Sequence, residues 1–320
     1  MIDRSAQSAI ETILRDELTR GDLALSGVAP VLTHMLSGSG GSLVSEAIVA
    51  RLRGMLGHLA HQLLTSKSTD YCPDEADRLT NFLASDGAVL SHCYAIAMEG
   101  HLTERLERKA SLDPILSPLM QELIASDSAE VAELAMTTLA AQSRFVQTSK
   151  RMEMPLAELP AEVFQCLLQL WAQAPIVAGA DSDKAAMKRS LADLRAGYDE
   201  GAARAGLLAR LVSAMRGGSR AALSLEHAGL ALFSTALSAL TRQPRELAIL
   251  SCHERQSARL ALSLRAAGMI ESEIEQQFAI LHPEQQLPSG FDHMLPDRAQ
   301  TLISQSDKHA VSQQNSGQAR

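Results

Sequence analysis

The chain has 320 residues, of which 46% are hydrophobic and 3% are aromatic, and its formal net charge is −8. The hydrophobic content excludes a chain that is disordered throughout. The acidic balance argues against nucleic acid as a partner, because nucleic-acid binding relies on Lys and Arg to neutralise phosphates. A core built from Leu, Ala and Met favours helices over strands. We therefore predict an all-α fold without a sheet, a bundle or array of roughly ten to twelve helices.

The first helix is predicted over Ile2–Leu18, where apolar residues recur at helical spacing, and the Arg-Gly-Asp segment at 20–22 is expected to end it. A short segment follows at Val28–Leu36, and then a glycine-rich loop at Gly38–Ser42. The loop has neither a preceding strand nor the Gly-Lys-Ser/Thr ending of a phosphate loop, so we interpret it as a plain connection. The next helix, Leu43–Thr65, has a clear apolar stripe.

Capping residues and prolines indicate four further helix starts. The predicted helices begin at Pro73, at Asp86 (to Lys109), at Ser117-Pro118 (Leu119–Ala125) and at Asp127, as part of a capping box with Glu130 (to Lys150). Two prolines at 155 and 160 cannot both lie inside one regular helix. We therefore predict an N-terminal helical subdomain over 1–151, a junction near Met152–Pro160 and a C-terminal helical subdomain over 152–295.

The C-terminal half contains the most apolar stretch, Leu223–Gly268, which is predicted to be a helical hairpin at the centre of the fold. Its first helix is nearly uncharged, and its second begins after Pro244 and ends at Gly268. The other predicted helices are Pro160–Trp171, Lys184–Met215 with an expected cap at Asp183, and Glu271–Leu281. The polar segment 296–320 is predicted to be a disordered tail.

The chain is predicted to be cytoplasmic. Its most apolar helical run, Ala228–Leu240, spans 13 residues, whereas a membrane helix needs roughly 20. The first residues lack the apolar segment of a secretory signal. The four cysteines are far apart and form no Cys-x-x-Cys pair, which is typical of reduced thiols and indicates no zinc site.

Few residues suggest chemistry, and the only catalytic candidates are His253 and Glu254. A histidine followed by an acid on a helix resembles the phospho-accepting helix of sensor histidine kinases, in which the acid activates a nucleophilic imidazole. The Arg-Thr-Pro that follows in that family is absent here, and so is a nucleotide-binding domain. The alternative is a polar helix face. His58 and His61 are three residues apart, but no acid or cysteine completes a metal site, so neither a metal nor a cofactor is predicted.

The segments LSPL (116–119), DSAEVA (127–132), AAQSRFV (140–146) and RMEMPL (151–156) resemble uncharacterised helical proteins of alphaproteobacteria grouped under a domain of unknown function. The start D-x-x-E-V-A is also similar to the second helix of HEAT-type repeats. The resemblance implies an all-α, HEAT-like array and no assigned activity. It transfers no functional residue to this chain.

The function predicted from these features is a non-catalytic cytosolic protein-interaction or regulatory module that acts with a protein partner or as a homodimer. One alternative is a phosphotransfer or signalling component that uses His253, and another is a binder of a small apolar ligand. The three hypotheses differ in one spatial respect: an enzyme requires Glu226, His227, Cys252 and His253 to converge on one pocket.

Overall fold

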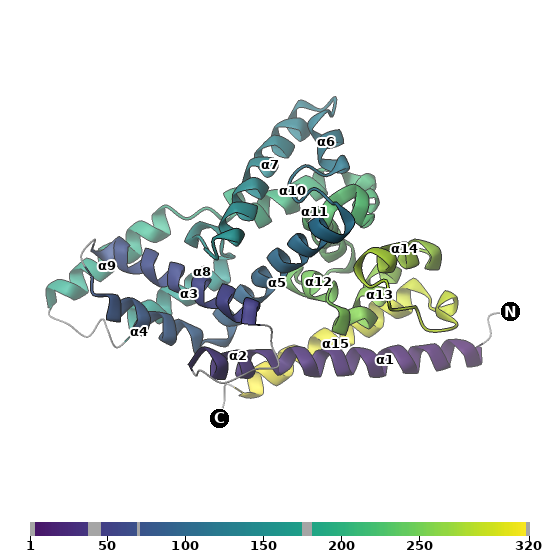
Figure 1. Cartoon of the computed structure of the whole chain (residues 1–320), viewed down its shortest axis with the longest axis horizontal. Helices are drawn as coiled ribbons and strands as arrows, with labels where there is room; N and C mark the ends of the chain where they lie inside the picture. Colours follow the sequence, from purple (N-terminus) through teal and green to yellow (C-terminus); the bar gives the residue numbers. More distant parts are fainter. Residues whose placement is uncertain (1–3, 38–45, 69–70, 175–180, 318–320) are drawn as a thin grey trace. The chain divides into compact units, whose positions relative to one another are not determined.

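The computed structural model describes residues 4–37, 46–68, 71–174 and 181–317, and within these ranges every regular element is a helix (Figure 1). The first seven helices are α1 (Arg4–Ser26), α2 (Val28–Ser37), α3 (Glu46–Lys67), α4 (Pro73–Ala84), α5 (Gly87–Ala110), α6 (Pro118–Ile124) and α7 (Ala129–Lys150).

The other α-helices are α8 (Ala161–Gln173), α9 (Asp181–Ala196), α10 (Arg204–Ala214), α11 (Leu225–Thr241), α12 (Arg245–Ser251), α13 (Ser257–Ala266), α14 (Glu271–Leu281) and α15 (Pro296–Gly317). Short 3-10 helices are η1 (Leu156–Glu158), η3 (Glu200–Ala202), η4 (Arg216–Leu223), η5 (Glu254–Gln256) and η6 (Phe291–His293). The all-α prediction is confirmed, with fifteen α-helices in the described ranges in place of ten to twelve.

The helix starts predicted from caps and prolines are confirmed at most positions. Asp86 accepts hydrogen bonds from the N–H groups of Ala88 and Val89, both at 3.0 Å, and so caps α5. Ser117 caps α6 by accepting from the N–H of Met120 at 3.3 Å. At α7 the cap is Ser128 rather than Asp127, because the Ser128 hydroxyl accepts from the third N–H of the helix.

Two predicted helices are broken. The helix expected over Lys184–Met215 is interrupted at 197–203, where Asp199 accepts from the N–H of Gly201 at 2.9 Å and starts η3. The helix expected to end at Gly268 stops at Ser251 and resumes as α13 after η5. Helix α1 does not end at the Arg-Gly-Asp segment but continues to Ser26. Helix α9 begins at Asp181, before the predicted cap Asp183. The predicted loop at 38–42 lies outside the described residues.

The segment predicted to be a disordered tail contains α15 (Pro296–Gly317). Its side chains at 299, 302, 303 and 306 are buried, and this spacing places them on one helical face. That face packs against α13 and α1. Tertiary packing therefore orders a segment whose composition is mostly polar.

The described residues form two compact units, each built from segments that are distant in the sequence. Unit 1 comprises 1–28, 102–132 and 211–320, and unit 2 comprises 29–101 and 133–210. These units do not correspond to the predicted subdomains, and the predicted junction at Met152–Pro160 lies inside unit 2. There, His58 accepts from the N–H of Met154 at 3.0 Å and Gln62 accepts from that of Leu156 at 3.0 Å.

Unit 1 is organised around α13, which lies within the stretch predicted to be central. Its residues Ala258–Leu264 are all buried, including the polar Arg259 and Ser263. A helix buried on every side needs neighbours all round, and α13 packs against α1, α11, α12, α14 and α15. In α11, Gly229 adopts φ 69° and ψ 164°, so the helix breaks at that residue.

Unit 2 has an aliphatic and aromatic core. The apolar stripe predicted for α3 is buried at its described positions, whereas Val44 lies outside the described residues. Helix α3 packs against α4 and α9, and α4 packs against α8. Phe164 of α8 is buried and stacks on Tyr198 with ring centroids 4.1 Å apart. Among the described residues no single helix could span a membrane by length and hydropathy, and only the pair η4 and α11, bent by 116°, passes that test together.

Candidate functional site

Neither catalytic candidate lies on an α-helix, and Glu254 is the first residue of the 3-10 helix η5. His253 precedes η5 with an extended backbone at φ −85° and ψ 144°, and its Nδ1 accepts from the N–H of Arg255 at 3.3 Å. Glu254 is exposed. The helix ends before them because the N–H groups of Cys252 and His253 bond to carbonyls only three residues back, in a 3-10 turn. The prediction of a helix-borne histidine is therefore wrong.

The other residues of that hypothesis have separate partners. Cys252 is buried, and its thiol donates to the carbonyl of Ala248 in its own helix at 3.5 Å. His227 pairs with Glu122 of α6, with Nε2 and Oε1 3.0 Å apart, while Glu226 is exposed. The contacts of His227 and Cys252 thus lead to different helices, α6 and α12.

Burial also makes two of the four cysteines, Cys93 and Cys166, poor nucleophiles. It raises the pKa of Cys93 to about 12. It also raises the pKa of Cys166, and the negative charge of Asp86 raises it further. The thiol, rather than the reactive thiolate, is thus the form present at neutral pH. All four cysteines lie in the described ranges and none forms a disulfide. Within the same ranges, no group of three or more His, Cys, Asp or Glu side chains is placed to hold a metal.

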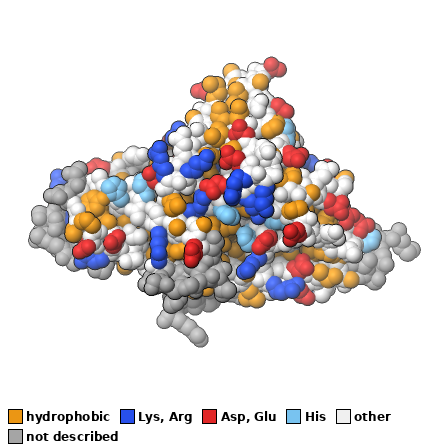
Figure 2. Space-filling model, viewed as in Figure 1, with side chains coloured by type: hydrophobic (Ala, Val, Ile, Leu, Met, Phe, Trp, Pro, Cys, Tyr) orange, Lys and Arg blue, Asp and Glu red, His pale blue; other side chains and the backbone are white. Residues whose placement is uncertain are grey.

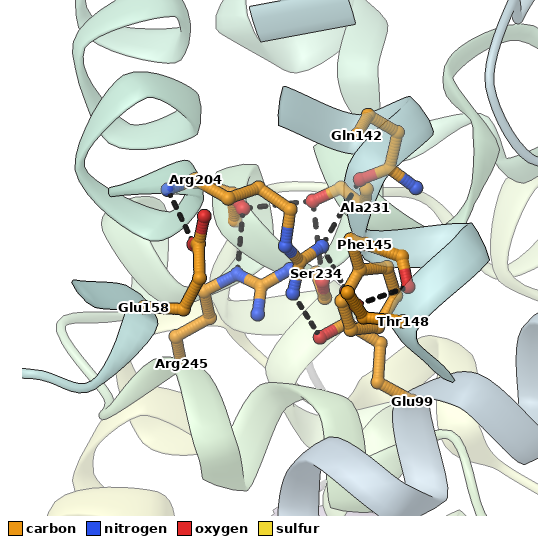
Figure 3. A network of polar contacts seen from close by, with 10 residues as sticks. Glu99, Gln142, Phe145, Thr148, Glu158, Arg204, Ala231, Ser234 and Arg245 are labelled. Carbon is orange, nitrogen blue, oxygen red and sulfur yellow. Dashed lines mark hydrogen bonds and ion pairs between the residues drawn. The ribbon is translucent and has the colours of Figure 1, made fainter. Parts of the chain in front are cut away.

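Each unit instead contains a buried arginine. In unit 2, Arg204 and Glu99 are 3% and 1% exposed and form an ion pair with Nη2 and Oε2 2.7 Å apart. Figure 3 shows the Arg204 guanidinium beside Gln142, which accepts from Nη1 at 3.0 Å, and Phe145, whose ring centroid is 3.6 Å away. The backbone N–H of Arg204 donates to Glu158 at 2.8 Å. The polar groups that contact Arg204 belong to the protein's own side chains. We therefore interpret the ion pair as a structural fastening, that is, a contact that holds parts of unit 2 together.

In unit 1, Arg259 of α13 is 1% exposed and contacts two other helices and the loop between α11 and α12. Its Nη2 group donates to Asp22 of α1 at 2.7 Å and to Ser306 of α15 at 2.8 Å. Its Nη1 group donates to Gln243 at 3.1 Å. Ser306 also donates to Asp22. This side chain therefore fastens α1 and α15 to the central helix.

A second polar group in unit 1, which we call the His282 cluster, comprises Arg105, His253, His282 and Gln285. His282 directly follows α14 and is 4% exposed. Arg105 of α5 donates to the last carbonyl of α14 at 3.3 Å. The backbone N–H of Gln285 donates to the His282 carbonyl at 2.9 Å, and its Nε2 donates to the Glu254 carbonyl at 3.1 Å. The cluster joins α5, α14 and η5.

The imidazole of His282 is neutral at neutral pH. Burial, together with the nearby charges of Arg105 and His253, lowers the pKa of His282 to about 4. Phe278 packs edge-on to the ring, with centroids 5.8 Å apart. The Nε2 atom of His282 and the Oε1 atom of Gln285 are buried and have no hydrogen-bond partner among the described residues. Two polar atoms here retain unused hydrogen-bonding capacity.

The sequence offers no signal for this cluster. His282 stands at a helix end before Pro283, a position read only as a helix stop. Arg105 is 176 residues from the carbonyl that it contacts, so only the tertiary fold brings the two together.

An exposed surface near α14 combines apolar and acidic groups, and we call it the α14 surface: Ile270, Glu271, Glu275, Asp292 and Leu295. Ile270 is 55% exposed and Leu295 is 39% exposed. The Arg265 guanidinium donates to the carbonyls of the residues directly before them, Met269 and Met294. The Arg265 side chain thus links the two backbone segments that carry Ile270 and Leu295.

The acidic groups of the α14 surface repel one another. Desolvation raises the pKa of Glu271, and the charges of Asp292 and Glu275 raise it further, whereas the nearby charges of Arg265 and His293 lower it by less. Figure 2 shows acidic side chains gathered over the part of the face where Figure 1 places α14. A cation bound there would relieve this repulsion.

No family model, curated protein or solved structure matches this chain.

Proposed function

We propose that this protein is a non-catalytic, cytoplasmic interaction or regulatory module, and that its α14 surface binds a basic amphipathic helix of a partner protein. The observation that carries the proposal is the pairing of two exposed aliphatic side chains, Ile270 and Leu295, with the carboxylates beside them. Apolar contact supplies affinity, and charge supplies orientation and faster association.

The charge of the surface also identifies the kind of partner. A second copy of this chain would bring Glu271, Glu275 and Asp292 against the same carboxylates, which is unfavourable. A helix with Leu on one face and Lys on the other matches both the aliphatic pair and its acidic surroundings. A basic partner is therefore favoured over a homodimer through this face.

The phosphotransfer alternative is weakened by the position of His253. The hypothesis required a histidine displayed on a helix face, whereas His253 caps η5 and its Nδ1 accepts a backbone hydrogen bond. The family resemblance and the HEAT-like arrangement stay predictions.

The test uses the full chain and a fluorescent Leu/Lys amphipathic helical peptide, followed by anisotropy. The double variant Ile270→Asp/Leu295→Asp and the double variant Glu271→Lys/Glu275→Lys should each weaken binding at least about tenfold. Raising NaCl from about 50 to about 500 mM should weaken binding to the wild type, because exposed charges are screened.

Matched controls lie elsewhere on the chain. Met136→Asp changes an apolar residue that is 60% exposed on α7, and Glu107→Lys changes an exposed acid on α5. Both should bind the peptide like the wild type. The proposal fails if the α14 variants and the controls bind equally well, or if light scattering shows that the chain self-associates through the α14 surface.

A further inference from the structure

The His282 cluster carries an inference that is independent of the α14 surface. Burying a polar atom without a hydrogen bond is unfavourable, so most buried polar atoms in folded proteins have a partner. His282 Nε2 and Gln285 Oε1 have none among the described residues, although the first belongs to a side chain that is only 4% exposed. The cluster is therefore suited to receive a small polar molecule.

Arg105 determines the charge of that molecule. Its guanidinium is half-buried and donates to the terminal carbonyl of α14, and it forms no ion pair with a described acid. A guanidinium has five N–H donors in a planar fork. One hydrogen bond to a backbone carbonyl leaves the other N–H groups of Arg105 available to an oxyanion. The oxyanion would also neutralise the positive charge of the guanidinium.

Gln285 determines whether the bound molecule needs a hydrogen-bond donor. Its Nε2 is fixed by the Glu254 carbonyl at 3.1 Å, and this orients the amide so that Oε1 is the remaining atom. That oxygen only accepts hydrogen bonds. A fully deprotonated oxyanion has no donor for it, whereas an oxyanion that carries a hydroxyl does.

We propose that Arg105, His282 and Gln285 form a binding site for a hydrogen-bearing oxyanion, namely free hydrogen phosphate. Arg105 contacts a charged oxygen, Gln285 Oε1 accepts from the P–O–H group, and His282 Nε2 bonds to a third oxygen. The charged or titratable groups that act on His282 are Arg105 of α5 and His253 before η5. Glu254 contributes its backbone carbonyl, and its side chain is exposed.

The test is a titration of the full chain, labelled with 13C in its histidine rings, followed by NMR. The His282 signal is identified as the one missing in His282→Gln. Inorganic phosphate should shift it in a saturable way, and sulfate, which carries no proton at neutral pH, should bind at least about tenfold more weakly because Gln285 Oε1 is then left without a donor. Phenyl phosphate, whose second pKa of about 6 leaves it mostly without a P–O–H group at neutral pH, should bind more weakly than inorganic phosphate in a separate titration.

Two variants and a control assign the roles. Arg105→Gln should weaken phosphate binding at least about tenfold. Arg108→Gln, one turn further along α5 and exposed, should leave it unchanged. Gln285→Leu should bring the affinities for phosphate and sulfate close together, and it tests the site even if Arg105→Gln fails to fold. An unmoved His282 signal, equal effects of the two arginine variants, or a wild type that prefers sulfate would overturn the proposal.

Discussion

The residues with the largest individual consequences are the buried ionic ones. Removing Arg204 would leave Glu99 charged, 1% exposed and without its strongest partner. Breaking a buried pair in this way costs about 3–5 kcal/mol, whereas replacing both partners by apolar groups is often close to neutral. We expect Arg204→Met to lower the free energy of unfolding by about that amount and Arg204→Met/Glu99→Met to restore most of it.

Urea unfolding of the single and double variants measures this difference. The interpretation of the pair as a structural fastening is contradicted if the double variant is as unstable as the single variant.

His282 predicts a specific pH dependence. Its pKa is lowered from 6.5 to about 4 in the folded chain, so the unfolded chain binds more protons between these values and stability falls as pH decreases through this window. His282→Gln should remove that contribution, which is on the order of 2 kcal/mol. Unfolding curves of both proteins at pH 7 and pH 4 check it. A difference that is the same at both pH values contradicts the predicted sign.

Among the helices, α11 owes its break to a single residue. Gly229 has φ 69°, and an added Cβ would lie 3.4 Å from the Cβ of Ser117. Gly229→Ala should therefore destabilise the chain by about 1 kcal/mol or more. Gly57 on α3 is the matched control, because nothing lies within 4 Å of its added Cβ. Gly57→Ala should stabilise by up to about 1 kcal/mol.

Thermal unfolding of the two glycine variants is the measurement. If both shift the melting temperature in the same direction, backbone conformation is not what distinguishes the two positions.

Helix starts could be predicted from the sequence because capping is local. Asp86 and Ser117 accept hydrogen bonds from N–H groups two or three residues further along the chain. The buried face of α3 can be predicted from the spacing of its apolar residues alone. The breaks after Ala196 and Ser251 are not predicted, since no proline marks either of them. The four buried positions of α15 are visible in the sequence as well, but the polar composition around them suggested disorder.

At the scale of the whole chain, the units and the candidate sites could not be predicted. Unit 1 joins three separated segments, and neither Arg259–Asp22 nor Arg105 with α14 leaves a local trace in the sequence. Of the site residues proposed from sequence, His253 does lie in the His282 cluster, although as a neighbouring charge and not as a nucleophile.

Because α1, α13 and α15 share the core of unit 1, we predict that a destabilising substitution in α15 also destabilises α1. Ile303 is fully buried, whereas Thr301 on the same helix is exposed. Ile303→Asp should destabilise by more than about 3 kcal/mol, because it buries a charge and loses apolar contact. Amide exchange should accelerate in α1 and α13 as well as in α15. Thr301→Asp should leave exchange unchanged, and acceleration confined to α15 would contradict the coupling.

The fastening by Arg259 also bears on synthesis. Arg259 is 237 residues after Asp22, and ribosomes add roughly 5–20 residues per second. Roughly 10–50 s therefore pass between the synthesis of α1 and the synthesis of α13, the helix that covers its apolar side. Every segment of unit 2 has been translated before that helix appears. Nascent α1 is thus open to aggregation, or to binding by a holding chaperone, while translation continues.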